Sequence, residues 1–360
     1  MSPIETVAEA PALPAVHVHN RKFIGSKFSL LPFITEVVDR CCPDARTAAD
    51  LFAGTGVVAY ALAARGLAVV AADNLYSCYV PLRAFLTGGA ETRAGRVAEL
   101  LRTLSALPGK RGYVWENYGG RYFTEENAAR IDAIREQIAA WAAGGVVDAA
   151  EEAMLLTSLL YAADKVANTC GQYDAYLKHL GREAYSPDGT HLVDASVYRP
   201  LTLGMPVPAP GGHRHRVLLG DANELVRRVE VDLLYLDPPY NTRQYIDNYH
   251  VLENIARWER PPLYGKTRKF RREAHKSRYS RRGEAARALA ELVRDARCRH
   301  ILLSYSAEGI LPHETLVRIL ETRGDVAVYT RKYTVFGNGA GRSRRRPVLE
   351  RLYYCRVTRP

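Results

Sequence analysis

The sequence predicts an α/β fold: a doubly wound, mostly parallel, Rossmann-like sheet of seven strands with an antiparallel last strand, plus an inserted, largely helical domain. Short apolar runs alternate with helical stretches, the order typical of a parallel sheet covered by helices. The last two runs, 326–334 and 348–357, are joined by a glycine- and arginine-rich loop without a helix, so they should pair antiparallel. Between about residues 85 and 215 the alternation stops, which indicates the insertion.

Seven runs are expected to be strands because they are apolar and end at acids, glycines or other turn residues. They are 47–52, 68–72, 216–219, 231–236, 300–304, 326–334 and 348–357. A covering helix is expected at 314–322. The carboxyl ends of parallel strands meet at one edge of a sheet, where ligands bind in such folds.

The domain boundaries follow from the same pattern. Residues 1–19 lack the basic start of a signal peptide and are expected to be a disordered leader. Residues 20–84 and 216–360 would form the sheet domain, and residues 85–215 the inserted helical domain. Apolar stripes predict two helices in the insertion. They span 125–143 and 149–170.

Asp237, Pro238, Pro239 and Tyr240 follow the apolar run 231–236 directly. The proline rings fix the backbone and remove competing donors. The carboxylate of Asp237 and the carbonyl of Pro238 are two acceptors, an arrangement that can hold both N–H bonds of an exocyclic amine on a planar base. Tyr240 can stack on a base that has swung out of a duplex. The alternative is that two prolines only end a strand.

A glycine turn, Gly54 to Gly56, follows the run 47–52 and precedes an apolar helix at 57–64. Glycines let the backbone approach a ligand closely, and the start of a helix presents free N–H groups. The turn therefore predicts a cofactor site. It also satisfies the loose dinucleotide fingerprint, so a nicotinamide cofactor is an alternative.

Two acids flank this turn. Asp73 ends the next strand, 21 residues beyond Phe52, and an acid at that distance is placed to bind both hydroxyls of a ribose. Asp50 lies at the end of the first strand, where an acid can hold the amino group of a methionine moiety. Asp50 therefore favours a methionine-derived cofactor over nicotinamide.

Five stretches in one order run over most of the chain. They are RKFIGSKFSLLPFI at 21–34, DLFAGTGVVA at 50–59, AADN at 71–74, LLGDANEL at 218–225 and LLYLDPPYNTRQYIDNYHVLENIARW at 233–258. On these stretches the chain resembles the DNA adenine methyltransferases that modify the N6 amino group, which use S-adenosylmethionine and a DPPY motif. The resemblance is to the group whose recognition region lies between the donor and catalytic motifs; residues 85–215 match only loosely.

The resemblance implies roles for particular residues. Asp237, Pro238 and Tyr240 would be catalytic; Phe23, Gly25 and Lys27 would close over the methyl donor, Asp73 would bind its ribose, and Asp221 its adenine amine. One family variant has two glycines before the lysine, whereas Ile24, Gly25 and Ser26 stand here. The full set expected to bind S-adenosylmethionine is Phe23, Gly25, Lys27, Asp50, Phe52, Gly54, Gly56, Asp73 and Asp221.

Positive charge is concentrated after the catalytic motif. The formal net charge is +11, and residues 257–282 contain eleven Lys and Arg against two acids. Such a loop can neutralise phosphates, although a solvated surface is the alternative. The residues expected to contact DNA are Arg243, Lys266, Arg268, Lys269, Arg271, Arg272, Lys276 and Arg278. A second cluster of arginines, at 342–346, is expected to grip the same backbone.

Composition restricts the class of protein. A chain of 360 residues with 47% hydrophobic residues is typical of a globular enzyme. The sequence has no uncharged apolar stretch long enough to span a membrane, so we expect a cytoplasmic protein. Its six cysteines have neither metal-ligand nor CxxC spacing, so we expect no metal site and no disulfide framework.

The sequence thus predicts a DNA methyltransferase that transfers a methyl group from S-adenosylmethionine to N6 of adenine in duplex DNA, with base flipping and without a metal. Its expected partners are double-stranded DNA and, in a restriction-modification setting, a companion restriction endonuclease. Two alternatives stay open: a cytosine-N4 or RNA amino-methyltransferase, and a non-catalytic nucleic-acid-binding subunit that retains the fold.

Overall fold

The computed structural model describes residues 13–89, 91–177, 180, 194–211, 214–335 and 346–359. Its strands are β1 Ala15–Val16, β2 Thr47–Asp50, β3 Ala68–Asp73, β4 Met205–Pro206, β5 Arg216–Leu219, β6 Glu230–Leu236, β7 Arg297–Ser306, β8 Gly324–Val335 and β9 Arg346–Val357. Its α-helices are α1 Leu31–Cys41, α2 Val57–Ala64, α3 Tyr76–Thr87, α4 Glu91–Ala106, α5 Tyr113–Tyr118, α6 Glu125–Ala143, α7 Ala149–Lys165, α8 Ala222–Leu225, α9 Tyr245–Arg257, α10 Ala285–Asp295 and α11 His313–Glu321.

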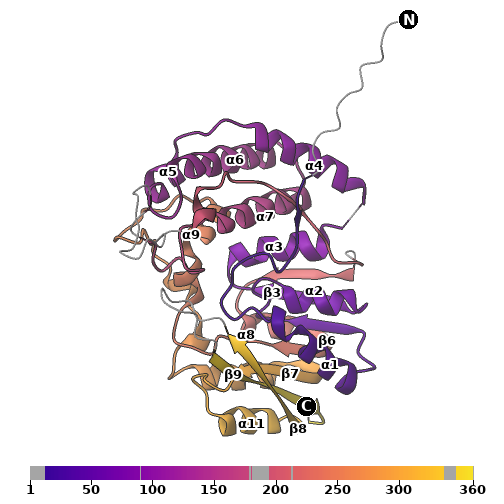
Figure 1. The fold of residues 1–360 in the computed structure, drawn as a ribbon. Coiled ribbons are helices and arrows are strands. Elements are labelled where there is room, and N and C mark those ends of the chain that lie inside the picture. Colours follow the sequence, from indigo (N-terminus) through magenta and orange to yellow (C-terminus); the bar gives the residue numbers. More distant parts are fainter. Residues whose placement is uncertain are drawn as a thin grey trace, which may run out of the picture.

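Seven strands form one sheet in the order β5-β3-β2-β6-β7-β9-β8 (Figure 1). Neighbouring strands from β5 to β7 are parallel, while β9 lies antiparallel between β7 and β8. The predicted fold class is therefore confirmed, including the antiparallel last strand. From β2 the chain continues to β3 on one side, while β6 lies on the other side of β2, so the strand order reverses at β2. The carboxyl ends of these three parallel strands meet at one edge of the sheet, where the site lies.

The central strands are buried on both faces, as expected for a parallel sheet covered by helices. Adjacent residues of one strand enter opposite cores: Ala48 packs with α1 and α2, and Ala49 packs with α8, α10 and α11. The same split occurs at Leu233 and Leu234 of β6. The loops at the carboxyl edge are thus held by a core that is rigid on both sides.

A third core lies among α4, α5, α6, α7 and α9, above the sheet in Figure 1. The start of α7 is fixed by a capping box, in which Asp148 and Glu151 each accept a hydrogen bond from the other's backbone amide. Helix α3 packs against both this core and the sheet, through Ala84 and Leu82. Helix α6 has the predicted bounds, whereas α7 ends at Lys165 rather than at residue 170.

The expected disordered leader needs a correction. Residues 1–12 lie outside the described residues, but residues 13–19 are folded against the protein. Ala15–Val16 pairs in parallel with Met205–Pro206, and the Val16 and Val18 side chains are buried. The prediction of disorder is therefore wrong for residues 13–19, because two valines in this short segment fill the core beside α1 and α2.

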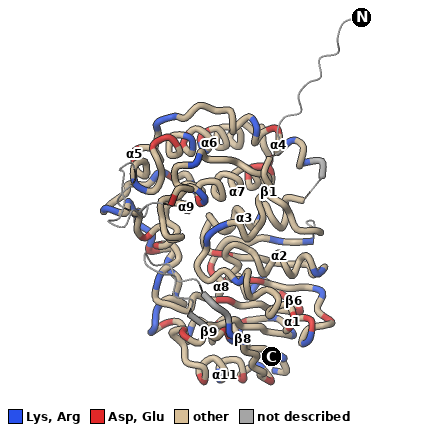
Figure 2. Tube along the Cα trace, in the orientation of Figure 1, with Lys and Arg blue, Asp and Glu red and all other residues tan. Residues whose placement is uncertain are grey.

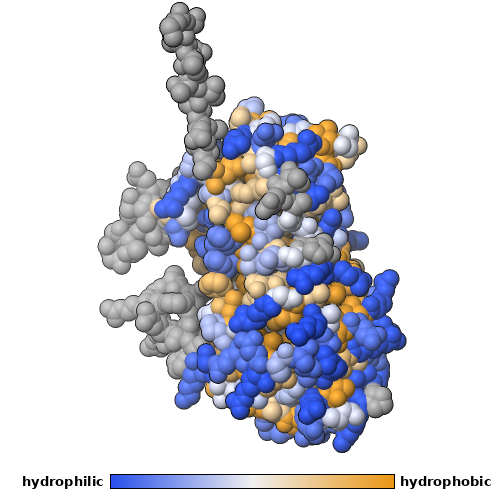
Figure 3. Space-filling view, turned by 90° about the vertical axis from the view of Figure 1, so that its right-hand side faces the viewer, coloured by the Kyte–Doolittle hydropathy of each residue, from blue (hydrophilic) through white to orange (hydrophobic). Residues whose placement is uncertain are grey.

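The surface is largely hydrophilic on the face shown in Figure 3, with apolar side chains scattered among polar ones. Lys and Arg accumulate in the loops beside and below α9 (Figure 2). Among the described residues, no helix combines the length and apolarity needed to cross a membrane. The described part of the chain also contains no group of three His, Cys, Asp or Glu side chains placed to hold a metal ion.

Candidate functional site

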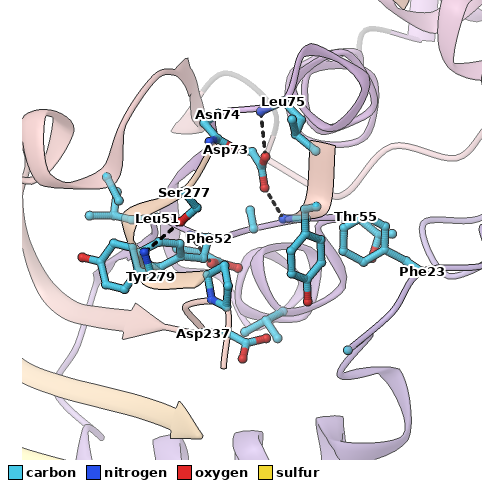
Figure 4. A pocket seen from close by; sticks show the side chains of 18 of the residues that line it. Phe23, Leu51, Phe52, Thr55, Asp73, Asn74, Leu75, Asp237, Ser277 and Tyr279 are labelled. Atoms are coloured by element: carbon cyan, nitrogen blue, oxygen red, sulfur yellow. Dashed lines mark hydrogen bonds between the residues drawn. The ribbon is translucent and has the colours of Figure 1, made fainter. Parts of the chain in front are cut away.

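A pocket lies at the carboxyl edge of β2, β3 and β6, and its empty space, counted together with the open solvent at its mouth, is about 890 Å³. It extends from Asp73 and the glycine turn at one end to Asp237 at the other (Figure 4). One continuous pocket therefore joins the predicted donor turn to the predicted catalytic strand end. Of the predicted residues, those that line it are Phe23, Gly25, Lys27, Asp50, Phe52, Gly54, Asp73, Asp221 and Asp237.

The glycine turn is held by Asp73. Its Oδ2 accepts a hydrogen bond from the Gly54 amide and its Oδ1 accepts one from the Leu75 amide, both at 2.9 Å (Figure 4). Both carboxylate oxygens keep a lone pair for a ligand. Burial raises the pKa of Asp73 to about 6, although the two amides oppose the shift.

The two glycines of the turn have different structural roles. Gly54 has φ +53°, and a Cβ there would lie 2.9 Å from the Phe23 ring, so only glycine lets this ring close over the pocket. Gly56 has φ +87°, and a Cβ there would lie 2.6 Å from Leu82 of α3. Gly56 does not line the pocket. It lets α3 pack closely against the start of α2.

The loop that carries Phe23 and Lys27 is fixed by α9. The amide of Ile24 donates to the Tyr249 hydroxyl at 2.7 Å, and the Tyr245 hydroxyl donates to the Ile24 carbonyl at 3.3 Å. The Phe23 ring stacks on Tyr249 with 4.6 Å between ring centroids. The helix that follows the DPPY motif therefore positions the loop on the opposite wall of the pocket.

Asp237 ends β6 and forms an ion pair with Lys27, whose Nζ lies 2.9 Å from Oδ1. Oδ1 is buried and has no partner but Lys27 within the described residues, and the other oxygen, Oδ2, accepts no hydrogen bond from them. The carbonyl of Pro238, a buried residue, accepts no hydrogen bond from the described part of the chain either. The strand end therefore presents two acceptors without a hydrogen-bond donor among the described residues.

The Tyr240 ring lies beside these acceptors but does not line the pocket. The Lys27 ammonium lies 5.4 Å from its centroid, in cation–π geometry. The ring also meets Tyr305 edge-on, with 6.2 Å between centroids, and the Tyr240 carbonyl accepts the Ile310 amide at 2.9 Å. Tyr240 is thus held in place by the end of β7 and the loop after it.

Three carboxyl groups around the pocket have raised pKa values. Burial raises the pKa of Asp237 to about 6, with Lys27 opposing the shift and the nearby Glu350 reinforcing it. Burial, followed by the charge of Asp237, raises the pKa of Asp50 well above its ordinary value. Together with Asp73, these groups make a pocket in which a positively charged ligand would relieve carboxylate repulsion.

Two aromatic rings give the pocket an apolar wall. The rings of Phe52 and Tyr279 meet edge-on, 4.9 Å between centroids, and both line the pocket (Figure 4). Asp221 also lines the pocket, and its carboxylate caps α8 by accepting the Asn223 amide at 2.9 Å. This wall suits a flat, apolar ring with an amine at its edge.

Sequence reasoning missed one wall of the pocket. Gln244 and the backbone of Ser277 exchange two hydrogen bonds, of 3.1 and 2.7 Å, which draws the end of the basic segment onto the site. His275, Ser277 and Tyr279 therefore line the pocket, although they lie inside the predicted DNA-contacting loop at 257–282. No local motif marks them, and only the tertiary pairing with Gln244 reveals them.

The predicted DNA-contacting residues lie on or near this basic segment. Four of them form ion pairs with nearby acids: Lys269, Arg272, Lys276 and Arg278. Arg243 instead donates a hydrogen bond to Gln172 at 3.1 Å. Three others form no ion pair within the described residues. They are Lys266, Arg268 and Arg271. The second predicted cluster, at 342–346, lies outside the described side chains.

Comparison with known proteins places the same residues in one family. Residues 23–193 and 212–319 match the family described as D12 class N6 adenine-specific DNA methyltransferase. The type II methyltransferase M.NlaIII of Neisseria lactamica is 34% identical over 324 residues, 87% of this chain and 92% of that protein. The type II methyltransferase M.FokI of Planomicrobium okeanokoites is 35% identical over 84% of this chain, which spans 47% of that protein. The modification methylase StsI of Streptococcus sanguinis is 33% identical over 83% of this chain and 46% of its own length.

Proposed function

The chain belongs to the D12 class of N6 adenine-specific DNA methyltransferases, and from this membership we propose that it methylates N6 of adenine in duplex DNA with S-adenosylmethionine as donor. One observation supports this function above the others: a single pocket joins the glycine turn to the Asp237 carboxylate at the end of β6. A binding subunit without catalysis would not need this acceptor and a donor site in the same pocket.

The pocket suits S-adenosylmethionine. When bound, this donor supplies a methyl group on a positively charged sulfur and leaves as S-adenosylhomocysteine. Asp73 would accept its ribose hydroxyls, Phe52 and Tyr279 would hold its adenine ring, and Asp221 would accept from the adenine amine. Asp50 would hold its amino group. The crowded carboxyl groups around the pocket, whose pKa values are raised by burial and by neighbouring carboxylates, favour this donor, which carries a sulfonium and an ammonium, over nicotinamide.

At the other end, the target adenine would leave the duplex and stack on Tyr240. Asp237 Oδ2 and the Pro238 carbonyl would accept its two N6–H bonds and direct the nitrogen lone pair toward the methyl group. As the new C–N bond forms, positive charge moves onto N6, where the Asp237 carboxylate stabilises it. Asp237 then takes up the proton that the nitrogen releases and passes it to water.

The basic segment would bind the duplex beside the pocket. Lys266, Arg268 and Arg271 have no competing ion pair among the described residues, so they are the first expected to neutralise phosphates. The other predicted residues would join them by exchanging their present partners for phosphates. These residues are Arg243, Lys269, Arg272, Lys276 and Arg278. The helices α4 to α7 stand above this segment and would hold the far side of the duplex.

The similar proteins suggest the biological process in which the reaction takes part. M.NlaIII and M.FokI are type II methyltransferases, so we infer a role in restriction-modification, with a companion restriction endonuclease as partner. We propose a cytoplasmic enzyme, since its DNA substrate and its donor would be met there. The reaction needs no metal, because carboxylate and carbonyl acceptors supply the electrostatic stabilisation.

Tritium transfer tests this function. The protein is incubated with S-adenosyl-L-[methyl-³H]methionine and either duplex DNA or RNA, and the nucleosides are separated after digestion. We expect label in N6-methyldeoxyadenosine from DNA alone. Label in N4-methylcytosine or in RNA would support the amino-methyltransferase alternatives, and no label with intact donor binding would support the binding subunit.

A further inference from the structure

Glu350 is a buried carboxylate with no assigned role, and it lies behind the catalytic strand end. It belongs to β9, next to Ser304 and Ser306 of β7, and its side chain is 1% exposed. Its Oε1 accepts the Ser304 hydroxyl at 2.7 Å and lies 3.5 Å from Lys27 Nζ. Its Oε2 is buried and makes no hydrogen bond within the described residues. A carboxylate so placed is costly to bury unless it acts on a charged neighbour.

That neighbour is Lys27, which lies between two carboxylates. Its Nζ is 2.9 Å from Asp237 and 3.5 Å from Glu350, and the Lys27 side chain is only 4% exposed. Burial lowers the pKa of Lys27, but the two carboxylates together raise this pKa by more than burial lowers it. The ammonium therefore stays charged. Strand β9, the loop that carries Lys27 and the end of β6 thus meet in a chain of charges: Glu350, Lys27, Asp237.

We propose that Glu350 is a positioning residue for methyl transfer, holding the Lys27 ammonium between two carboxylates so that Lys27 orients Asp237 without capturing both of its oxygens. Asp237 Oδ2 then stays free to accept from the target amine. This inference rests on the proposed function, since it assigns the role of Asp237 in that reaction.

The surroundings of Asp237 support the inference. The other titratable groups that face it are Asp50 of β2, Tyr235 of β6, Tyr240 and Tyr245. None of these groups is a cation, so among the described residues Lys27 is the counter-charge of Asp237. Glu350 competes with Asp237 for the Lys27 ammonium. Burial raises the pKa of Asp237 most, while Lys27 lowers it and Glu350 raises it. Glu350 therefore keeps Asp237 a stronger acceptor than an isolated ion pair with Lys27 would allow.

Glu350→Gln tests the inference because it removes the charge and keeps an acceptor for Ser304. Lys27 should then bind Asp237 fully and compete with the target amine. We expect kcat for DNA methylation to fall about tenfold, while the donor Kd from calorimetry changes less than about twofold. The acid limb of the pH–rate profile should move to lower pH, which a merely loosened fold would not cause.

Two further variants complete the test. If Glu350 acts through Lys27, Glu350→Gln should change kcat less than about twofold in a Lys27→Met background, because the competing ammonium is gone. This double variant also contains no unpaired Glu350 charge, so it decides the matter if Glu350→Gln alone fails to fold. The matched control is Glu36→Gln, which removes an exposed carboxylate paired with Arg331 of β8 and should leave kcat unchanged.

The outcomes separate the inference from the function on which it rests. A wild-type kcat with an unmoved acid limb in Glu350→Gln, or independent losses in the double variant, would overturn the positioning role. A wild-type protein that transfers no label to DNA would instead remove the proposed function itself.

Discussion

The carboxylate of Asp73 accepts a hydrogen bond from the Gly54 amide, 2.9 Å between Oδ2 and nitrogen, across the ends of β3 and β2. This bond fixes the shape of the glycine turn on which the Phe23 ring closes. The same acid is the one expected to bind the donor ribose. Asp73 therefore couples the local backbone conformation to donor affinity.

Asp73→Ala should weaken donor binding strongly. It removes hydrogen bonds to a charged acceptor, each of which contributes about 2 kcal/mol, so the donor Kd should rise roughly 30-fold or more. Isothermal titration calorimetry with S-adenosylmethionine measures this change. The control is Asp39→Ala, which removes an exposed carboxylate paired with Arg65 at 3.3 Å. Equal donor affinities in the two variants would contradict the role of Asp73.

Gly54→Ala should also impair the donor site. A Cβ at φ +53° is strained and would lie 2.9 Å from Phe23, so the ring must move off the pocket. Gly66→Ala is a matched control, because Gly66 has φ +88° but nothing within 4 Å of an added Cβ. Both variants should lose about 1 kcal/mol of unfolding free energy, and only Gly54→Ala should lose donor affinity. Similar donor affinity in both variants would contradict a role for the Phe23 ring in donor binding.

The sheet could be predicted closely because its strands are apolar runs that end at motif residues. β5 has the predicted bounds, and β6 and β9 differ from them only at their starts. Helix α3 was missed, and the predicted boundary at residue 84 falls inside it. Pro81 interrupts its pattern, and its partners, α7 and α9, are distant in sequence. The folded segment 13–19 was missed for the same reason, since its partner strand is β4.

In the candidate site, too, residues within contiguous motifs could be predicted, whereas residues brought in by distant contacts could not. Residues in contiguous motifs, such as Asp73 and Asp237, line one pocket because strand ends carry them there. Ser277 and Tyr279 were not found, because their charge-rich surroundings indicate a DNA-contacting loop and their pocket contacts depend on Gln244. Glu350 carries no motif, and only the pairing of β9 with β7 brings it to Lys27.

Methyl transfer should lose activity in acid. Burial raises the pKa of Asp237 to about 6, and once protonated the carboxyl can no longer serve as an acceptor for both its neighbours. Because the pKa of Asp73 is also about 6, the measurement uses saturating donor, and we expect kcat to be constant above this value and to fall tenfold per pH unit below it. Lys27→Met should move the limb to higher pH, since Lys27 lowers the pKa of Asp237. DNA binding measured over the same range is the control, and a flat profile through pH 6 would contradict the assignment.

Removing positive charge from the basic segment should act on DNA affinity alone. Replacing Lys266, Arg268 and Arg271 with alanine should weaken DNA binding and reduce the slope of log K against log salt by about one unit for each phosphate that is no longer neutralised. Fluorescence anisotropy over a series of salt concentrations measures the slope. Donor affinity should be unchanged, because these side chains do not line the pocket.

The matched control removes the same amount of charge elsewhere. Arg65, Arg96 and Arg287 are surface arginines paired with carboxylates on α1, α7 and α10. Their triple alanine variant should keep a salt slope close to that of the wild type. If both triple variants lose affinity equally, net charge rather than the basic segment directs DNA binding.

The most direct measurement is the rate of tritium transfer to duplex DNA by purified Asp237→Ala, with DNA and donor binding recorded on the same preparation. We expect transfer at least about a thousandfold slower than in the wild type, with DNA affinity retained. Transfer within about tenfold of the wild-type rate would show that the end of β6 does not hold the target amine.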